Sequence, residues 1–140
     1  MIIRKAKIAD WPGIKGVLQS TGKFSKGDLE DVMEIILTGT GGSFVLIDSD
    51  KIIGTVSGHW HKTKGGKEAN VEQIAVSGLY RGRGLGYKLL RRIIQFFKSK
   101  GNKEVYSRWT KPVVVPFYTK FGFKTAGKTK RSVDLVYQMK

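Results

Sequence analysis

A cationic, glycine-rich loop between an apolar run and an amphipathic stretch is the feature that most limits how this chain of 140 residues can fold. Residues 71–76 read VEQIAV and predict a β-strand, and from residue 84 onward the apolar side chains recur at helical spacing. The predicted order is therefore strand, loop, helix. The loop holds two arginines and three glycines, namely Arg81, Gly82, Arg83, Gly84 and Gly86.

This loop has the properties of an anion site. Glycines let the backbone approach a ligand without a Cβ in the way. The first N–H groups of the following helix have no internal acceptor, and they coincide with the positive end of the helix dipole. Two arginines add charge and planar donors. The sequence therefore predicts that the loop binds a phosphate or pyrophosphate.

Two common phosphate-binding loops do not fit. The Walker A string G-x-x-x-x-G-K-[ST] does not occur in the chain. Gly82 and Gly84 fit the start of the dinucleotide pattern G-x-G-x-x-G, but neither Tyr87 nor Lys88 supplies its last glycine. The spacing that does occur is R-x-x-G-x-G, from Arg81 to Gly86.

That string resembles the acyl-CoA pyrophosphate loop of the GNAT superfamily of N-acetyltransferases. The resemblance extends to the preceding IAV (74–76), the following YKLL (87–90) and the later VPFYTKFGF (115–123), in the same order and at about the same separation. It implies a mixed α/β fold, with a twisted, mostly antiparallel sheet and helices on both faces. It also implies one acyl-CoA N-acyltransferase domain over residues 1–140, transferring acetyl from acetyl-CoA to a primary amine directly, in a ternary complex.

The resemblance assigns residues to the cosubstrate. Independently of it, an irregular end of the strand that leaves an N–H group near Ile74–Val76 unpaired is expected to offer that group to the thioester oxygen. One departure concerns Lys111, which stands seven residues before Tyr118, where similar proteins often have an asparagine that contacts the pantetheine arm. The expected acetyl-CoA contacts are Ile74, Ala75, Val76, Arg81, Gly82, Arg83, Gly84, Leu85, Gly86, Tyr87, Lys111 and Phe117.

Transfer to an amine requires a base for the amine and an acid for the leaving thiolate. The resemblance makes Tyr118, in F-Y-x-K-F-G-F, the general acid; a packed aromatic residue is the alternative reading. It places a base at Asn70 or Glu72, and only Glu72 can accept a proton. Strand parity puts these two residues on one face with Ile74 and Val76.

Two histidines on the adjoining strand remain alternatives for the base. His59 and His61 alternate with Trp60, so they share a face, and an ordinary imidazole pKa suits proton removal near neutrality. As a metal site the H-x-H pair is a weak signal, because spacing fixes no third ligand. No metal is therefore expected.

The net charge of +15, from 26 basic and 11 acidic residues, favours anionic partners. Acyl-CoA accounts for part of this charge, and solubility is another explanation. Nucleic acid is expected to bind only weakly and non-specifically, because the basic residues are dispersed and no recognition motif occurs. Alternative functions are a nucleic-acid-associated binding protein without turnover and an acyl-CoA sensor. The acidic residues gather between Asp28 and Glu34, which favours a locally cationic acceptor amine.

Composition excludes several other classes. The chain has no cysteine, so disulfides, thiolate metal sites and a cysteine-borne acyl intermediate are excluded. There is no apolar run of membrane-spanning length and no pattern typical of a signal peptide. We expect no membrane contact, a cytoplasmic location and a monomer or homodimer.

The hydrophobic periodicity and turn residues predict the remaining elements. Expected helices are a stretch capped by Asp10 and ending near Thr21, a second capped by Ser25, a third over 84–100 and a short fourth over 113–121. Expected strands are 1–8, 43–47, 51–61, 68–76, 103–109 and 132–139, with a loose turn over 62–67.

Overall fold

The structure, a computed structural model, describes residues 1–139, and its strands form a single mixed sheet. The helices are α1 (Trp11–Ser20), α2 (Lys26–Thr38), α3 (Leu85–Ser99) and α4 (Val115–Phe121), with 3-10 turns at Ile8–Asp10 and Gly78–Tyr80. The strands are β1 (Ile2–Lys5), β2 (Gly41–Asp48), β3 (Lys51–Thr63), β4 (Gly66–Val76), β5 (Glu104–Thr110), β6 (Lys124–Lys128) and β7 (Val133–Gln138).

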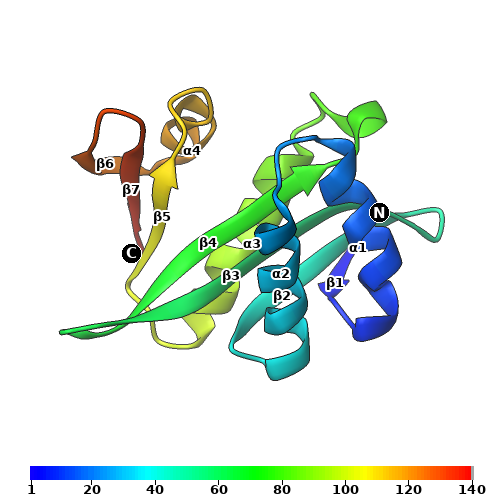
Figure 1. Cartoon of the computed structure of the whole chain (residues 1–140), viewed down its shortest axis with the longest axis horizontal. Helices are drawn as coiled ribbons and strands as arrows, with labels where there is room; N and C mark the ends of the chain where they lie inside the picture. The colour runs from blue at the N-terminus through cyan, green and yellow to red at the C-terminus, as the bar shows by residue number, and fades with distance from the viewer. Residues whose placement is uncertain (140) are drawn as a thin grey trace.

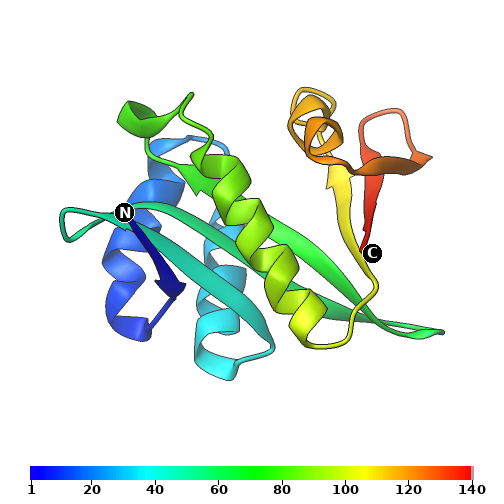
Figure 2. The ribbon, with the colours of Figure 1, turned by 180° about the vertical axis from the view of Figure 1, so that it is seen from behind.

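The sheet has the order β1-β2-β3-β4-β5-β7-β6, and β4–β5 is its only parallel pair among the described residues. Helices α1 and α2 cover one face, and α3, which connects β4 to β5, covers the other (Figures 1 and 2). The predicted fold class, a mostly antiparallel mixed sheet with helices on both faces, is confirmed. None of the helices in residues 1–139 combines the length and apolar character needed to cross a membrane.

Two apolar clusters, one on each face of the sheet, form the core. The α3 side holds the stripe that the sequence predicts, and burial of each such side chain stabilises the fold by about 1.5 to 3 kcal/mol. This packing fixes the start of α3, and hence the loop before it. The buried stripe is Leu85, Leu89, Leu90, Ile93, Ile94 and Phe97.

Strands β4 and β5 pair over only two positions, Ala69 with Val105 and Asn70 with Tyr106, and then separate (Figure 1). Arg108 of β5 lies beside this divergence. Its Nε donates to Glu68 Oε2 of β4 at 2.8 Å, and its Nη1 donates to Asp134 Oδ2 of β7 at 3.1 Å. The C-terminal part of the sheet thus diverges from β4, and the guanidinium group of Arg108 links the two parts beside the opening.

A β-bulge interrupts β4 beside this opening. Ser57 of β3 lies opposite Gln73, whereas the next residue, Gly58, lies opposite Val71, so Glu72 has no partner of its own. The extra residue changes which faces the side chains take. Ile74 packs toward α3, whereas Glu72 meets histidines of β3 on the other face. The strand-parity prediction that put Asn70, Glu72, Ile74 and Val76 on one face is therefore wrong beyond Glu72.

Other differences from the predicted elements have local causes. Asp10 does not cap α1: its carboxylate accepts two bonds from Arg4, at 2.7 and 2.8 Å, and one from the Lys7 backbone N–H. The expected loose turn at 62–67 is a hairpin in which Thr63 pairs with Gly66. Strand β6 was missed because KTAGK has no apolar alternation. Ser25 caps α2 as predicted, accepting from the Asp28 N–H.

Candidate functional site

Two adjacent hollows follow the edge where β4 separates from β5. The first, of about 320 Å³, lies at the glycine-rich loop and includes Val76 and Phe117. The second, of about 360 Å³, includes Ile74 and Tyr118. Ile74 and Val76 are alternate residues of β4, and Phe117 and Tyr118 are consecutive on α4, so the hollows succeed one another along the same two elements. Together they can hold an extended ligand.

The loop leaves the start of α3 open to an anion. Gly82 and Gly84 have φ of +77° and +75°, a conformation that favours glycine, and a Cβ at either position would meet nothing within 4 Å. No side chain caps α3. The first intrahelical bond runs from the Lys88 N–H to the Gly84 carbonyl at 3.3 Å. The N–H groups of residues 85–87 therefore have no acceptor within the helix.

Gly86 has a different role from the other two glycines. A Cβ there would lie 3.0 Å from Phe117 Cε1. Phe117 also stacks on Tyr87, with ring centroids 5.0 Å apart and an interplanar angle of 6°. The absence of a side chain at Gly86 therefore lets α4 close against the first turn of α3, which forms the wall of the first hollow.

The two loop arginines are anchored locally. Arg81 Nε donates to the Val76 carbonyl at 3.1 Å. Arg83 lies with its guanidinium carbon 5.3 Å from the centroid of the Tyr80 ring, and the Tyr80 hydroxyl donates to Asp48 Oδ2 at 3.0 Å. These contacts fix the loop. Arg81 lines the first hollow, so its charge lies beside the free N–H groups, whereas Arg83, also predicted to contact acetyl-CoA, lies over Tyr80 and does not line it.

The end of β4 presents backbone donors to the cleft. The Ser77 N–H donates to the Ile53 carbonyl of β3 at 2.7 Å. Because antiparallel bonding alternates, Ala75 also directs its amide toward β3, whereas the amides of Val76 and Ile74 point to the side that β5 has left. Three residues of this strand are predicted to contact acetyl-CoA, and Ala75 is the one whose amide points away from the cleft. Its side chain belongs to the α1/α2 cluster.

Tyr118 has the state required of a proton donor. Its side chain is 5% exposed, and its ring contacts Phe117 and Phe123 with centroids 5.2 and 5.1 Å away. Burial raises the pKa of its hydroxyl to about 12, although the neighbouring Ser107 hydroxyl opposes this. The phenol is therefore neutral throughout the physiological range and can give a proton but not take one.

This burial predicts a pH dependence of stability. The folded-state pKa of Tyr118 lies above the usual value of 10, so its contribution is complete below pH 10 and is lost as the pH rises toward about 12. The contribution is on the order of 2 to 3 kcal/mol. We expect the free energy of unfolding, measured in urea, to fall more steeply between pH 10 and 12 in the wild type than in Tyr118→Phe. Parallel curves for the two proteins would contradict the assignment.

Glu72, His59 and His61 form one cluster. Glu72 Oε1 lies 2.6 Å from His61 Nε2 and 3.1 Å from His59 Nδ1, and the two imidazole rings lie 4.1 Å apart. Burial raises the pKa of Glu72, but the two histidines beside its carboxylate outweigh burial and hold the pKa below its ordinary value. The nearby Glu72 carboxylate in turn raises the pKa of His59. The residues that the sequence offers as alternative bases thus lie together.

Glu72 also connects two spaces. It lines the Tyr118 hollow and a further one of about 280 Å³ that holds both histidines, Asp31 and Glu34.

Lys111 is exposed and lines the Tyr118 hollow, so it lies away from the glycine-rich loop. Sequence reasoning named Thr110 with Lys111 as a substitute contact for the arm but missed Ser107, whose hydroxyl lies 2.8 Å from that of Thr110 in the same wall. No local pattern indicates Ser107, because the irregular end of β5 brings it there.

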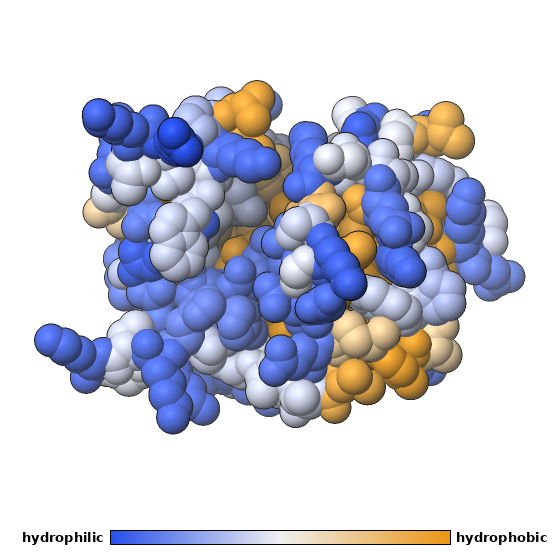
Figure 3. Space-filling model, in the orientation of Figure 1, coloured by the Kyte–Doolittle hydropathy of each residue, from blue (hydrophilic) through white to orange (hydrophobic). Residues whose placement is uncertain are grey.

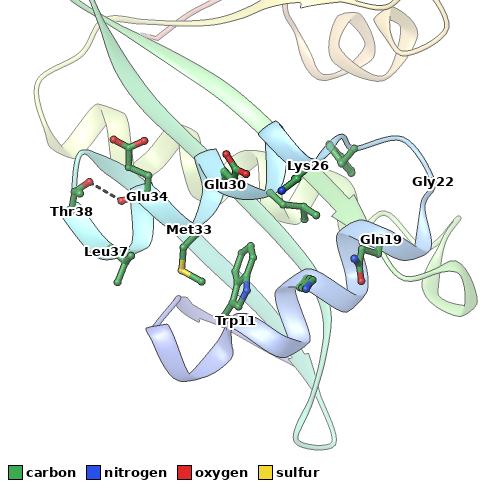
Figure 4. Close-up of a pocket in the computed structure, with 12 residues that line it drawn as sticks. Trp11, Gln19, Gly22, Lys26, Glu30, Met33, Glu34, Leu37 and Thr38 are labelled. Atoms are coloured by element: carbon green, nitrogen blue, oxygen red, sulfur yellow. Dashed lines mark hydrogen bonds between the residues drawn. The ribbon is translucent and has the colours of Figure 1, made fainter.

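A groove of about 920 Å³ lies between α1 and α2, away from this site. Figure 4 shows Trp11 and Met33 between the two helices, and Figure 3 shows hydrophobic surface near their lower ends. The groove contains neither the loop nor Tyr118. Its chemistry is that of an apolar surface, so it is not the candidate active site.

Comparison with known proteins gives one family match and many structural neighbours. The model of the acetyltransferase (GNAT) family matches residues 11–123. A probable glucosamine 6-phosphate N-acetyltransferase 2 of Oryza sativa subsp. japonica is 38% identical over 63 residues, covering 45% of this chain and 37% of that protein. N-acetyltransferase 8B of Rattus norvegicus is 27% identical over 106 residues, covering 72% and 48%. The chain thus spans less than half the length of these curated relatives.

Among solved structures, PaiA N-acetyltransferase from Thermoplasma acidophilum in complex with coenzyme A has a TM-score of 0.79 at 18% identity, over 98% of each chain. The GNAT family N-acetyltransferase YhbS from Escherichia coli, also in complex with CoA, has a TM-score of 0.80 at 23% identity, over 98% of this chain and 80% of its own. At such identities the likeness concerns the fold.

Proposed function

Because the chain belongs to the acetyltransferase (GNAT) family, we propose that it transfers the acetyl group of acetyl-CoA to a primary amine within one domain. The observation that carries this proposal is the alignment of an open helix start with a buried, protonated tyrosine along one cleft. The free N–H groups at the start of α3 suit a pyrophosphate. Tyr118, in the adjoining hollow, suits the other end of the same ligand.

In the proposed complex the pyrophosphate lies at Gly82–Gly86 and the pantetheine arm passes between β4 and α4. The amides of Ile74 and Val76 face this path, so they can donate to the thioester oxygen as negative charge develops on it. Phe117 and Lys111 border the arm from the other side. The contact made by Lys111 would replace the one that an asparagine makes in similar proteins.

The chemistry is direct transfer. The amine nitrogen attacks the thioester carbon, a C–N bond forms and the C–S bond breaks. Tyr118 gives its proton to the departing sulfur, and Glu72 receives the proton lost by the amine. Glu72 lines the same hollow as Tyr118, and its Oε1 is hydrogen-bonded to His61 Nε2 at 2.6 Å. The histidines thus orient the carboxylate in this proposal instead of replacing it.

The acceptor class follows from the surrounding charge. The Tyr118 hollow holds carboxylates and cationic side chains together, whereas the adjoining hollow holds Asp31, Glu34 and Glu72 with no lysine or arginine. Carboxylates gathered on a protein of net charge +15 favour a cationic amine, such as a lysine side chain or an N-terminus, in this region.

The proposal is tested by thioester consumption. Acetyl-CoA is incubated with the protein and a panel of small amines, peptides and proteins, and free CoA is measured with a thiol reagent. The protein itself contributes no thiol because it has no cysteine. We expect amine-dependent release of CoA. CoA binding without release for any amine would favour an acyl-CoA sensor, and absence of CoA binding would favour a binding protein without turnover.

A further inference from the structure

We propose that His59, His61 and Glu72 form a binding site for a divalent transition-metal ion, with Zn²⁺ the best match. The ligand atoms of the three half-buried residues all lie within 4.8 Å of one another. His59 and His61 are the only histidines in the chain, and Glu72 adds one carboxylate from the neighbouring strand. Two imidazoles and one carboxylate are a ligand set typical of zinc sites with an open fourth position.

The fold brings these ligands together by two separate devices. On β3, the ring of Trp60 packs against Phe97 on the α3 side, so the flanking His59 and His61 point to the opposite face. On β4, the bulge gives Glu72 a place without a cross-strand partner, directed at the two imidazoles. The convergence thus comes from backbone geometry, which packing on the other face keeps in place.

The distances are close to those a metal requires. With bonds of about 2.0 to 2.1 Å, tetrahedral ligand atoms are separated by roughly 3.3 Å. Glu72 Oε1 lies 3.1 Å from His59 Nδ1 and 2.6 Å from His61 Nε2. An ion therefore needs the carboxylate to withdraw by less than about 1 Å and the two imidazole nitrogens, which lie within 4.8 Å of each other, to adopt a similar spacing, changes within the reach of side-chain torsions.

One nitrogen in the cluster is poorly satisfied by the protein. His59 Nδ1 is buried and makes no hydrogen bond of good geometry, although Glu72 Oε1 is within 3.1 Å. A buried imidazole nitrogen normally has a partner. Coordination to a cation supplies one, because the lone pair of a neutral imidazole is what a metal binds.

The adjoining hollow suits a dication. Asp31 and Glu34 line it beside the three ligands, so three carboxylates face a space of about 280 Å³. This space has room for a water molecule as a fourth ligand. Imidazole nitrogens select zinc and its neighbours in the first transition series over Mg²⁺ and Ca²⁺, which prefer oxygen ligands.

Occupancy would also affect the proposed reaction, and this consequence rests on the proposed function. A carboxylate oxygen that binds a cation cannot accept the proton of the amine. Zn²⁺ is therefore expected to inhibit acetyl transfer in the wild type.

Zinc binding is tested directly, without acetyl-CoA, on the untagged chain after treatment with a chelator. We expect titration calorimetry to show one equivalent of Zn²⁺ bound, with His61→Asn and Glu72→Gln weakening the affinity by at least about tenfold. Asp50→Asn is the matched control: it also removes one carboxylate, but in the β2–β3 turn, where φ of +65° suits asparagine. Its affinity is expected to match that of the wild type.

A second readout needs no variant. Because the chain has two histidines, its NMR spectrum contains two imidazoles, and both are expected to shift together as one equivalent of Zn²⁺ is added, while Mg²⁺ leaves them unmoved. Unshifted imidazoles, or equal affinity in wild type and His61→Asn, would overturn the site. Acetyl transfer is assayed separately, so a protein that turns over but binds no zinc refutes this site alone.

Discussion

Replacement of Tyr118 by phenylalanine is expected to lower kcat for acetyl transfer about 100-fold, with little change in CoA affinity. The change removes one hydroxyl and keeps a ring of the same shape between Phe117 and Phe123. Without that proton the sulfur must leave as a thiolate or take a proton from water. The measurement is steady-state kinetics together with a CoA titration of the same preparations.

Tyr137→Phe is the matched control. Tyr137 packs on Phe123, with ring centroids 5.4 Å apart, so it adjoins the same cluster as Tyr118 but does not line the cleft. Its loss of a hydroxyl is expected to leave kcat unchanged. Full turnover by Tyr118→Phe would mean that water or another group protonates the sulfur, and equal losses in both variants would indicate a general effect of packing.

The second large effect is expected at the loop. Gly84→Val should weaken CoA binding at least about tenfold, because a β-branched residue does not tolerate φ of +75° and the first turn of α3 must shift to accommodate it. The anion would then lose the aligned N–H groups of residues 85–87. Titration calorimetry with CoA measures the change.

Gly101→Val separates this effect from general destabilisation. Gly101 follows the other end of α3, also has a positive φ, of +90°, and also has nothing within 4 Å of an added Cβ. The strain is therefore similar, on the order of 1 to 2 kcal/mol, but the helix start is untouched. CoA affinity equal in the two variants would show that the pyrophosphate lies elsewhere.

Features set by local sequence were predictable. The glycines predict the loop, the apolar stripe predicts α3, and the residues around Ser25 predict the start of α2. Each of these signals lies within a few residues of the structure that it specifies. Strand β6 gives no such signal. It is exposed, and its pairing with β7 is what makes it a strand.

The candidate site shows the same division. Tyr118 and the loop lie in motifs, so their positions could be read from the sequence. The cluster of Glu72 with His59 and His61 depends on one extra residue in β4, and a bulge changes facing without leaving a mark in composition. Regular alternation of side chains along the strand therefore placed Ile74 and Val76 on the wrong face. It also left the carboxylate and the two imidazoles as alternative candidates for the base, whereas in the structure they lie side by side.

The short ladder between β4 and β5 divides the proposed catalytic groups between two structural units. The unit from β5 to β7 carries Tyr118, and the β1–β4 unit carries Glu72 and the loop. Backbone pairing joins the units at only two positions, but the Arg108 ion pair with Glu68, the stack of Phe117 on Tyr87 and a shared apolar cluster that includes Tyr118 also hold them together. A rotation at this join would change the separation of acid and base, and it would require the shared cluster between α3 and the C-terminal unit to repack. The width available to an acceptor is thus set by the side chains at this contact, so substitutions there are expected to change acceptor preference while the backbone of β4 and the loop keeps its course.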